Sequence, residues 1–505
     1  MTGGNHEGAR MLIYAVDLGT TNLKVALYDE SLRRLALSSK AVAYDTREER
    51  VEFDPSAIVA DVIGLICECA RLSGIDTRPH AAVIALTGQA ESLVLADRDI
   101  APVRPGISWL DSRASRESAE IEAEFTAPEG FRITGQPFPT PDWPASKLRW
   151  LARHEPRSLD AAKHVLMIKD YVQLKLTGVA AGESSTRAFT YFYDVTADAY
   201  WPEILEFCGV EMDKLPPIIA PGTTVGPVSA SIRAALPPAA RYTVNAGALD
   251  HFASMAGAGA YSDSVVSESS GTVLSLSFIA PNLKFDPSVL VSFHRGLRGH
   301  DIVCFDCADS GGVCLDWFKN NFYNSDSYDW LDSQLSARIH GLDAPLFLPY
   351  LTGLNPPEYF KEATGAFLEL TLRHDGIDMA YAVMEGVAHL LRSNIDYCED
   401  HLLGDVAGIV STGGGSASAF WSQLKADACD RTIVVPVETQ SVCRGAAVIG
   451  LVEAGILSGI EEAESLAPIS TKVYTPSHSG MHKTRYERFQ RLRDALYITA
   501  QENDG

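Results

Sequence analysis

The sequence of 505 residues predicts an α/β fold built from two like halves, and three observations carry this expectation. Short apolar runs typical of buried strands alternate with segments of helical periodicity through most of the chain. Residues 12–27 and 265–278 each read as two strands joined by a loop that contains Gly and Thr. A stretch rich in Pro and Gly, residues 215–242, reads as connecting structure before the second half. The repeated hairpin suggests an internal duplication with the two halves facing a cleft.

The composition is that of a globular protein with an acidic balance. Hydrophobic residues make up 46% and charged residues 21% of the chain, and 42 Lys and Arg against 65 Asp and Glu give a formal charge of −23. Broad binding to nucleic acid or to an anionic membrane needs a basic field, so we expect neither partner. Backbone amides can still bind a phosphorylated small molecule in such a protein.

Several features predict a cytoplasmic protein. We find no run of about 18 apolar residues that would cross a membrane. Residues 1–10 lack the apolar core of a signal peptide, and we expect them to be a mobile terminus. The nine Cys are scattered, which is typical of reduced thiols rather than of a disulfide framework. The most closely spaced are Cys304, Cys307 and Cys314, which we interpret as buried hydrophobes rather than metal ligands, because no second Cys or His pair has ligand spacing.

The elements of the first half are expected in a definite order. Strand 12–16 is followed by a strand with Leu23, Val25 and Leu27 on one face. A helix then begins with Asp54 as N-cap and Pro55 in the first turn. The further elements expected along the chain are a returning strand at 35–37, the end of that first helix at Gly74, strands at 81–86, 244–250, 346–350 and 432–435, and helices at 251–260, 377–403, 416–429 and 443–454.

These elements suggest a domain boundary just after the helix at 251–260. We therefore predict a mobile N-terminus over 1–10, an N-terminal domain over 11–260 and a C-terminal domain over 261–505.

The first hairpin loop carries groups suited to a phosphate. Gly19 allows backbone N–H groups to approach the ligand, and the hydroxyls of Thr20 and Thr21 add donors. Asp17 at the strand end can hold Mg²⁺ through water, and Lys24 can offset phosphate charge. The loop joins two strands and lacks the Gly-Lys-Ser/Thr ending of a P-loop. A plain hairpin turn is the alternative interpretation.

Three later features also stand at expected strand ends, where ligands bind in open α/β sheets. They are the loop Ser270-Gly271-Thr272, the run Gly413-Gly414-Gly415 before a helix, and Asp250. A carboxylate at such a position can accept a proton from a substrate hydroxyl. For Asp250 the alternative role is a helix N-cap, and the two roles are compatible.

Taken together and in order, these motifs resemble the FGGY family of carbohydrate kinases from about Leu12 to Gly455. The matching motifs are Asp17-Leu18-Gly19-Thr20-Thr21 with Lys24, Thr87-Gly88-Gln89, Trp109-Leu110-Asp111-Ser112-Arg113, Lys169-Asp170-Tyr171 with Leu176-Thr177-Gly178, Pro221-Gly222-Thr223, Gly247-Ala248-Leu249-Asp250, Ser270-Gly271-Thr272, Gly311-Gly312 with Trp317, Phe347-Leu348-Pro349-Tyr350, Glu385-Gly386-Val387-Ala388, Gly413-Gly414-Gly415 with Trp421, Gln423 and Asp427, and Gly445-Ala446-Ala447. Each motif is modest alone, but their order is specific.

The resemblance implies two actin-like (ribonuclease H-like) domains with ATP in the interdomain cleft, and transfer of the γ-phosphate of ATP to a sugar or polyol. It implies that the N-terminal domain, 11–260, binds sugar and phosphate and that the C-terminal domain, 261–505, binds the nucleotide. It gives Asp250 the role of catalytic base and places Asp17 at the Mg²⁺. The residues that it assigns to ATP and its phosphates are Asp17, Gly19, Thr20, Thr21, Lys24, Gly271, Thr272, Gly312, Asp316, Gly414, Gly415 and Ser418.

The resemblance also indicates the acceptor site. The residues that it assigns to the sugar are Gln89, Ala90, Glu91, Trp109, Asp111, Arg113, Asp250 and His251. Xylulokinases usually carry Met-His after the Gln, and glycerol kinases carry Arg-Glu there and Asp-Gln at the base. Ala90-Glu91 and Asp250-His251 match neither pattern, and Asp142-Trp143 occupies the region of another substrate contact. A pentulose such as xylulose is the favoured acceptor, with a hexulose, a tetritol or glycerol as alternatives.

Two other functions fit an actin-like fold. A non-catalytic ATP-binding module would bind nucleotide without sugar-dependent turnover, but it would need no base at Asp250. A nucleotide hydrolase would release ADP at a rate that sugars do not raise. A homodimer is compatible with the sequence, which carries no readable mark of an interface.

Overall fold

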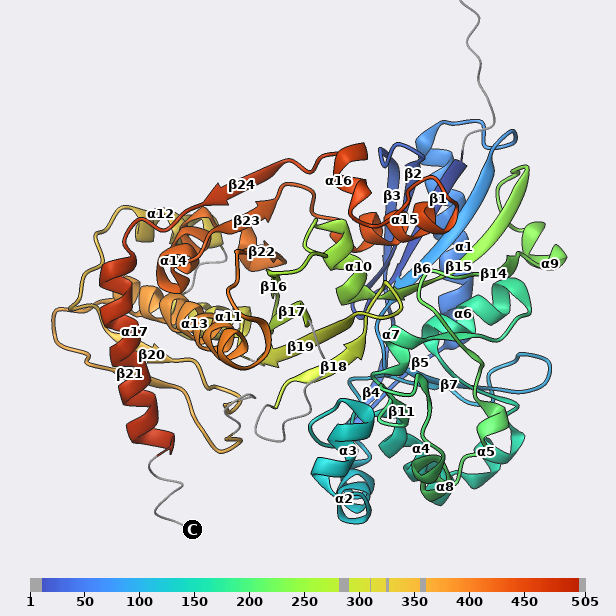
Figure 1. Cartoon of the computed structure of the whole chain (residues 1–505), viewed down its shortest axis with the longest axis horizontal. Coiled ribbons are helices and arrows are strands. Elements are labelled where there is room, and N and C mark those ends of the chain that lie inside the picture. Colours follow the sequence, from blue (N-terminus) through green and yellow to red (C-terminus); the bar gives the residue numbers. More distant parts are fainter. Residues whose placement is uncertain (1–10, 281–289, 309, 324–326, 355–359, 499–505) are drawn as a thin grey trace, which may run out of the picture. The chain divides into compact units, whose positions relative to one another are not determined.

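The computed structural model describes residues 11–280, 290–308, 310–323, 327–354 and 360–498 (Figure 1). The terminus 1–10, predicted to be mobile, lies outside the described residues. The chain divides into two compact units: unit 1 comprises Met1–Tyr261, Ser292–Val303 and Gln440–Pro468, and unit 2 comprises Ser262–Val291, Cys304–Thr439 and Ile469–Gly505. The predicted boundary after residue 260 lies beside the first change of unit. A single boundary did not anticipate that 292–303 and 440–468 pack with unit 1.

Unit 1 is built on a sheet with the strand order β14-β15-β6-β1-β2-β3. Its strands are β1 (Met11–Leu18), β2 (Asn22–Asp29), β3 (Arg34–Ala41), β6 (Ala81–Gly88), β14 (Thr224–Pro227) and β15 (Arg241–Leu249). A second sheet has the order β4-β5-β8-β7-β9, with β4 (Asp45–Arg47), β5 (Arg50–Phe53), β7 (Leu93–Ala96), β8 (Gly106–Ile107) and β9 (His164–Met167). The helices used below are α1 (Pro55–Ser73), α4 (Pro144–His154), α6 (Ile168–Thr177), α10 (Asp250–Gly257) and α15 (Ser441–Glu453).

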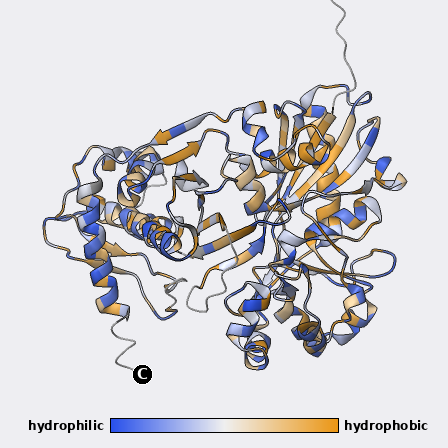
Figure 2. Ribbon diagram, in the orientation of Figure 1, coloured by the Kyte–Doolittle hydropathy of each residue, from blue (hydrophilic) through white to orange (hydrophobic). Residues whose placement is uncertain are grey.

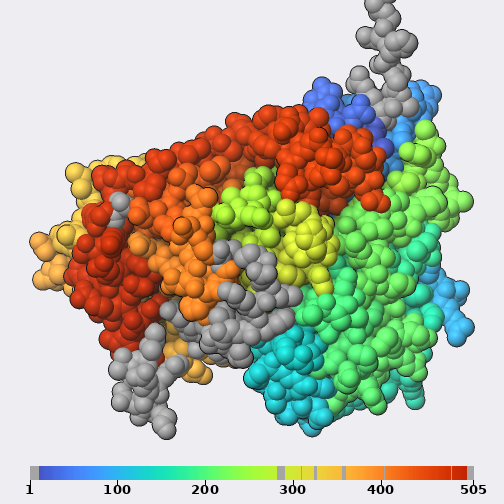
Figure 3. Space-filling model, viewed as in Figure 1, coloured from blue at the N-terminus to red at the C-terminus, as the bar shows by residue number. Residues whose placement is uncertain are grey.

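The central strands of unit 1 are hydrophobic on both faces, because helices cover both sides of the sheet. Strands β1, β6 and β15 are buried over almost their whole length, and they form the most hydrophobic part of this unit (Figure 2). Helices α1 and α6 contribute to the core on one face. Helix α15, far away in sequence, contributes to the core on the other face, and the segment that contains it lies beside the N-terminal strands in Figure 3.

Unit 2 contains the second hairpin and the other long helices. Its sheet includes the strand order β19-β17-β16-β22-β23-β24, with β16 (Val265–Ser270), β17 (Leu274–Ala280), β19 (Ile302–Ala308), β22 (Gly408–Thr412), β23 (Ile433–Pro436) and β24 (Thr471–Tyr474). A short pair is formed by β20 (Leu346–Leu348) and β21 (Ala366–Leu368). The helices are α11 (Gly312–Phe322), α12 (Tyr328–Ser336), α13 (Gly376–Cys398), α14 (Ala419–Cys429) and α17 (Ser479–Arg493).

Both predicted hairpins are present, since β1 pairs antiparallel with β2 and β16 pairs antiparallel with β17. The first helix has the predicted cap, because the Asp54 carboxylate accepts hydrogen bonds from the N–H groups of Ser56 and Ala57 and the helix ends at Gly74. The stretch 215–242 is not wholly irregular, because it contains β14, which extends the sheet beside β15.

Two predicted helices differ in detail from the structure. The helix predicted at 416–429 is preceded by a 3-10 turn over Gly414–Ala417, and α14 begins only at Ala419, because the side chain of Ser418 caps it. The helix predicted to end at 403 stays α-helical to Cys398 and continues as a π-helical turn. Among the described residues, the helices lack the length and apolar character needed to cross a membrane.

Helices α10 and α15 approach each other very closely within unit 1. A Cβ atom added to Gly257 would lie 1.8 Å from the carbonyl oxygen of Ser441 and 2.6 Å from the amide nitrogen of Gly445. The hydroxyls of Ser254 and Ser441 form a hydrogen bond of 2.9 Å across the same contact. Glycine is therefore required at 257 so that α15 can cover the sheet that carries the first hairpin.

We predict that Gly257→Ala destabilises the protein by about 2 kcal/mol or more, because overpacking a tight contact costs about 1–3 kcal/mol. The matched control is Gly64→Ala in α1, where an added Cβ meets no atom within 4 Å and helix propensity favours Ala by about 0.5–1 kcal/mol. Denaturant unfolding of both variants measures the two changes. A Gly257→Ala protein as stable as the wild type would contradict the close packing.

Candidate functional site

The candidate acceptor site lies where three parallel strand ends of unit 1 come together. Strand β6 lies between β1 and β15, and the register pairs Thr87 with both Asp17 and Ala248. The Thr87 hydroxyl donates a 2.9 Å hydrogen bond to the carbonyl of Ala248. The segments that follow the three strands, with Gly19, Gln89 and Asp250, therefore start at one edge of the sheet, where ligands bind in α/β folds.

Asp17 is a buried carboxylate next to two charges. Its side chain is 6% exposed, and Oδ2 lies 3.7 Å from Nζ of Lys24, which is its partner across the hairpin. Burial, together with the negative charge of Asp250, raises the pKa of Asp17 to about 7, and Lys24 opposes this rise. The carboxyl ends of β1 and β15 thus bring the charge of Asp250 near the buried carboxylate of Asp17.

Asp250 begins α10 but is not its N-cap. The N-cap position is Leu249, and Asp250 is the first helical residue. One carboxylate oxygen of Asp250, Oδ1, accepts a 2.7 Å hydrogen bond from the N–H of His251. The capping role considered from the sequence is therefore not the one that the structure shows. The charge of Asp250 instead contributes to raising the pKa of Asp17 and that of Glu91, in both cases after burial.

A chain of hydrogen bonds joins the first hairpin loop to the predicted sugar residues. Nε1 of Trp109 donates to the hydroxyl of Thr20 at 2.9 Å. The N–H of Trp109 donates to the hydroxyl of Ser92, which in turn donates to Oε1 of Gln89 at 2.9 Å. The loop with Thr20 and the segment with Gln89 are therefore fixed relative to each other through Trp109.

Glu91 is the most unusual residue of this region. It is a non-glycine residue with a φ of 66°, a conformation that costs energy and persists only where the surrounding structure enforces it. Burial raises the pKa of Glu91, the charges of Asp142 and Asp250 raise it further, and Lys147 opposes the rise. Burial in turn lowers the pKa of Lys147, while Glu91 opposes this change.

Lys147 was missed by the sequence analysis. It lies on α4 and is fully buried, and its Nζ donates a 2.8 Å hydrogen bond to the carbonyl of Ser108. A lysine on the buried face of an amphipathic helix, between Ser146 and Leu148 which are also buried, is the signal that could have revealed it, because lysines are rarely buried without a partner.

Two of the residues predicted to bind the sugar, Asp111 and Arg113, form an ion pair with each other. The Arg113 guanidinium binds both carboxylate oxygens of Asp111, at 2.8 and 2.6 Å, and also binds Glu52. Asp111 further accepts a hydrogen bond from the N–H of Val51. The pair is buried and connects this segment to β5. Of the other predicted residues, Ala90 is buried, and His251 lies near His294, whose pKa is lowered to about 3 by burial and further by the charge of His251.

In unit 2, the second hairpin loop meets the start of α11. The N–H of Gly312 donates to the carbonyl of Gly271, and the N–H of Val313 donates to the carbonyl of Thr272, both at 3.0 Å. Thr272 is exposed. Asp316, one turn further along α11, accepts a hydrogen bond from the Tyr328 hydroxyl.

The glycine run of unit 2 lies against the same hairpin. An added Cβ on Gly415 would lie 2.8 Å from Cβ of Ser270, whereas one on Gly414 would meet no atom within 4 Å. The Ser418 hydroxyl accepts a 2.9 Å hydrogen bond from the N–H of Trp421 and so caps α14. The structure thus brings together the predicted residues of 271–272, 312 and 414–418.

Unit 2 also holds a cluster with metal-ligand residue types, Glu385, His389 and His482. The Arg485 guanidinium, however, binds both oxygens of Glu385, and the Tyr381 hydroxyl donates to one of them. Since the carboxylate is already neutralised, we interpret this group as a buried ion-pair network that joins α13 to α17.

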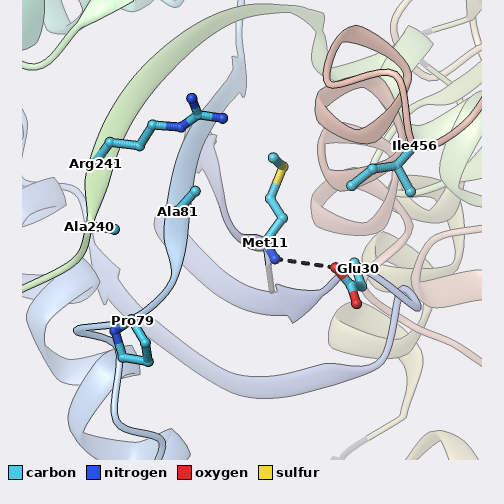
Figure 4. Close-up of a pocket in the computed structure, with 7 residues that line it drawn as sticks. All are labelled: Met11, Glu30, Pro79, Ala81, Ala240, Arg241 and Ile456. Carbon is cyan, nitrogen blue, oxygen red and sulfur yellow. Dashed lines mark hydrogen bonds between the residues drawn. The ribbon is translucent and has the colours of Figure 1, made fainter. Parts of the chain in front are cut away.

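A separate pocket of about 460 Å³ lies at the opposite edge of the sheet in unit 1 (Figure 4). Its walls include the first residues of three strands, Met11, Ala81 and Arg241, together with Glu30 and Ile456. The N–H of Met11 donates to the Glu30 carboxylate at 3.3 Å. This edge carries the amino ends of the parallel strands, away from Asp17 and Asp250.

An α/β core in each unit, with carboxylates at the strand ends of unit 1 and glycine-rich loops in unit 2, is the architecture expected of a two-domain phosphotransferase. The chain belongs to the FGGY family of carbohydrate kinases: the N-terminal domain of the family matches residues 12–257 and the C-terminal domain matches residues 293–454. It is an ATP-dependent sugar kinase, as the motifs predicted.

Named relatives support the family over the whole length. The chain is 27% identical over 507 residues to the xylulose kinase of Lactococcus lactis, with 97% of each chain covered. It is 26% identical over 477 residues to the gluconokinase of Bacillus subtilis, with 91% of each covered. The solved structure of ligand-bound xylulose kinase from Lactobacillus acidophilus matches with a TM-score of 0.88 at 24% identity, covering 96% of this chain and 98% of that one. This last likeness confirms the predicted fold.

We predict that Asp17→Asn stabilises the ligand-free protein at pH 8 and changes its stability little at pH 4. The carboxyl has an ordinary pKa of 3.8 and a folded pKa of about 7, so the folded state binds the proton more tightly and loses stability as pH rises from about 4 to above 7. The gain at pH 8 is at most about 4 kcal/mol, since one pKa unit corresponds to about 1.4 kcal/mol.

Urea unfolding of wild type and variant at pH 4, 6 and 8, without Mg²⁺ or nucleotide, measures this difference. A difference in unfolding free energy that does not depend on pH would show that Asp17 titrates normally.

Proposed function

We propose that this kinase phosphorylates a pentulose such as xylulose, with Asp250 as the catalytic base. The observation that supports this most is the convergence of Asp250, Glu91 and Asp17 at one edge of the unit 1 sheet. Carboxylates at strand ends can orient sugar hydroxyls by accepting their hydrogen bonds. The xylulose kinases among the relatives point to the same acceptor.

In this proposal the sugar hydroxyl attacks the γ-phosphorus of ATP while its proton passes to the Asp250 carboxylate. The bond between the γ-phosphorus and the bridging oxygen breaks, and ADP leaves. Phosphoryl transfer needs alignment and charge neutralisation more than covalent help from the protein. Thr20, Thr21 and the N–H groups around Gly19 would bind phosphate oxygens, and Lys24 would offset their charge.

The residues at the strand ends fit a magnesium ion. Asp17 and Asp250 are two carboxylates whose charges repel each other, and oxygen donors of this kind, directly or through water, are what Mg²⁺ prefers. When bound, the ion would neutralise charge on the phosphates. We propose that Asp17 holds it, while Asp250 keeps its role toward the sugar hydroxyl.

We propose that unit 2 binds the nucleotide. Gly271 and Thr272 would contact phosphate, and Gly312, Asp316, Gly414, Gly415 and Ser418 would surround the nucleoside. The open space beside Gly414 and the exposure of Thr272 support this assignment.

The free state of the eight described cysteines is compatible with the proposed cytoplasmic location.

Charge at the acceptor site favours a neutral sugar over a sugar acid. Glu91 is influenced by the negative charges of Asp142 and Asp250, and Lys147 is the cation that opposes them. A carboxylate on the substrate would add a further negative charge to this group. Gluconate, the acceptor that the name of the Bacillus subtilis relative implies, is therefore the less favoured candidate.

We predict that Asp250→Asn lowers kcat by about 10²–10⁴-fold, the range for removal of a general base. Binding of ADP should persist, because the substitution leaves the unit 2 loops unchanged. The matched control is Asp160→Asn, an exposed residue of unit 1, which should retain wild-type turnover. An Asp250→Asn enzyme with more than a tenth of wild-type kcat would exclude Asp250 as the base.

We predict that ADP release with MgATP rises at least tenfold above a sugar-free blank with one or more neutral ketopentoses, and stays near the blank with gluconate. The panel contains pentuloses, hexuloses, tetritols, glycerol and gluconate. A high blank that no sugar raises would indicate a hydrolase instead. Turnover with gluconate above that with every neutral sugar would refute the proposed acceptor class.

A further inference from the structure

A buried ion pair lies directly beneath the glycine-rich loops of unit 2. Glu268 on β16 is fully buried, and Lys425 on α14 is 1% exposed. The Lys425 Nζ lies 2.8 Å from Oε1 of Glu268. The other carboxylate oxygen, Oε2, accepts a hydrogen bond from Ser411 on β22. One carboxylate thus joins two neighbouring strands and a helix.

The pair continues into the first loop through Ser270. The Ser270 hydroxyl donates to Oε1 of Glu268 and accepts from Nζ of Lys425. Ser270 is itself 3% exposed and is followed at once by Gly271 and Thr272. The loop proposed to bind phosphate is therefore anchored at its first residue by two buried charges.

The second loop rests on the same serine. An added Cβ on Gly413, whose φ is 83°, would lie 2.9 Å from the backbone of Ser270, and one on Gly415 would lie 2.8 Å from Ser270 Cβ and 3.1 Å from the Trp421 ring. The Lys425 ammonium lies 5.1 Å from the centre of that ring. Lys425 therefore contacts Ser270 and Trp421, the two residues against which the glycine run packs.

We propose that Glu268 and Lys425 are positioning residues for the nucleotide: the ion pair sets the relative placement of loops 270–272 and 413–415. The inference rests on the proposed nucleotide role of those loops. The pair bonds to Ser270 at the end of β16 and to Ser411 near the end of β22, and it ties both to α14. The ends of these two strands are where the loops begin.

The physical reason is that a buried charge tolerates little displacement. Moving either partner leaves an unpaired charge in a poorly solvated interior, which is strongly unfavourable. The loops that depend on Ser270 are therefore held in one arrangement before nucleotide arrives. Binding of nucleotide then loses less free energy to ordering of the site. The pair should therefore affect the affinity for nucleotide and leave KM for the sugar unchanged.

The test compares nucleotide and sugar constants in the full-length enzyme. We predict that Lys425→Met raises KM for ATP and the Kd of ADP at least tenfold, while KM for the sugar changes less than twofold. The double variant Glu268→Gln with Lys425→Met should recover part of the lost affinity, because no unpaired charge remains. A Lys425→Met protein with wild-type nucleotide constants and only a lower Tm would overturn the proposal.

A milder pair of variants decides the question if Lys425→Met does not fold. Ser411→Ala removes one hydrogen bond to Glu268, and Ser393→Ala removes one to Arg493 elsewhere in unit 2. We expect Ser411→Ala to raise the Kd of ADP about threefold or more and Ser393→Ala to leave it unchanged. Equal constants in the two variants would overturn the proposal.

A third variant separates this inference from the proposed function. Gly414→Asp places a negative charge in the open space beside the glycine run and should abolish ADP binding. If Gly414→Asp binds ADP like the wild type, the proposed nucleotide site is wrong. If Gly414→Asp loses ADP while Lys425→Met and Ser411→Ala keep it, the nucleotide site stands and only the positioning role is wrong.

Discussion

The burial of the Asp17 carboxylate, with the negative charge of Asp250 nearby, is the constraint on which the site of unit 1 depends. Two parallel strands that flank β6 end near these carboxylates; burial makes the charge of Asp17 costly, and the charge of Asp250 adds to that cost. A protein can maintain such a pair only if the surrounding structure fixes it. Both sides of the sheet supply that rigidity, through α1 and α6 on one face and α15 on the other. A site that is unfavourable when empty gains most from a bound cation.

Unit 2 also has buried charges near its strand ends, but there they are of opposite sign. There the strand ends of β16 and β22 are held by a paired Glu and Lys, so the buried charge is neutral overall. In unit 1 the unbalanced negative charge can bind a cation and accept a proton. In unit 2 the balanced pair holds the loops in one arrangement. This division agrees with the different tasks proposed for the two units, catalysis on the sugar and placement of the nucleotide.

Local chemistry explains which features could be predicted from the sequence. The cap at Asp54, the end of α1 at Gly74 and both hairpins depend on residues adjacent in the chain, and the ordered motifs identified the family. The burial of Lys147 against the carbonyl of Ser108 and the contact of Arg113 with Glu52 depend on how distant segments pack. The return of α15 to unit 1 likewise depends on a contact between Gly257 and Ser441, 184 positions apart in sequence. Periodicity carries no information about such contacts.

If the charge of Asp250 lies close to the buried carboxyl of Asp17, it raises the pKa of Asp17, and the most direct test is a measurement of this pKa. It can be followed by ¹³C NMR of aspartate-labelled protein between pH 3 and 9, without Mg²⁺, in the wild type and in Asp250→Asn, with Asp17→Asn to assign the signal. We predict titration near pH 7 in the wild type, and a clearly lower midpoint in Asp250→Asn because the like charge is gone. A midpoint near 4 in both proteins would contradict the account.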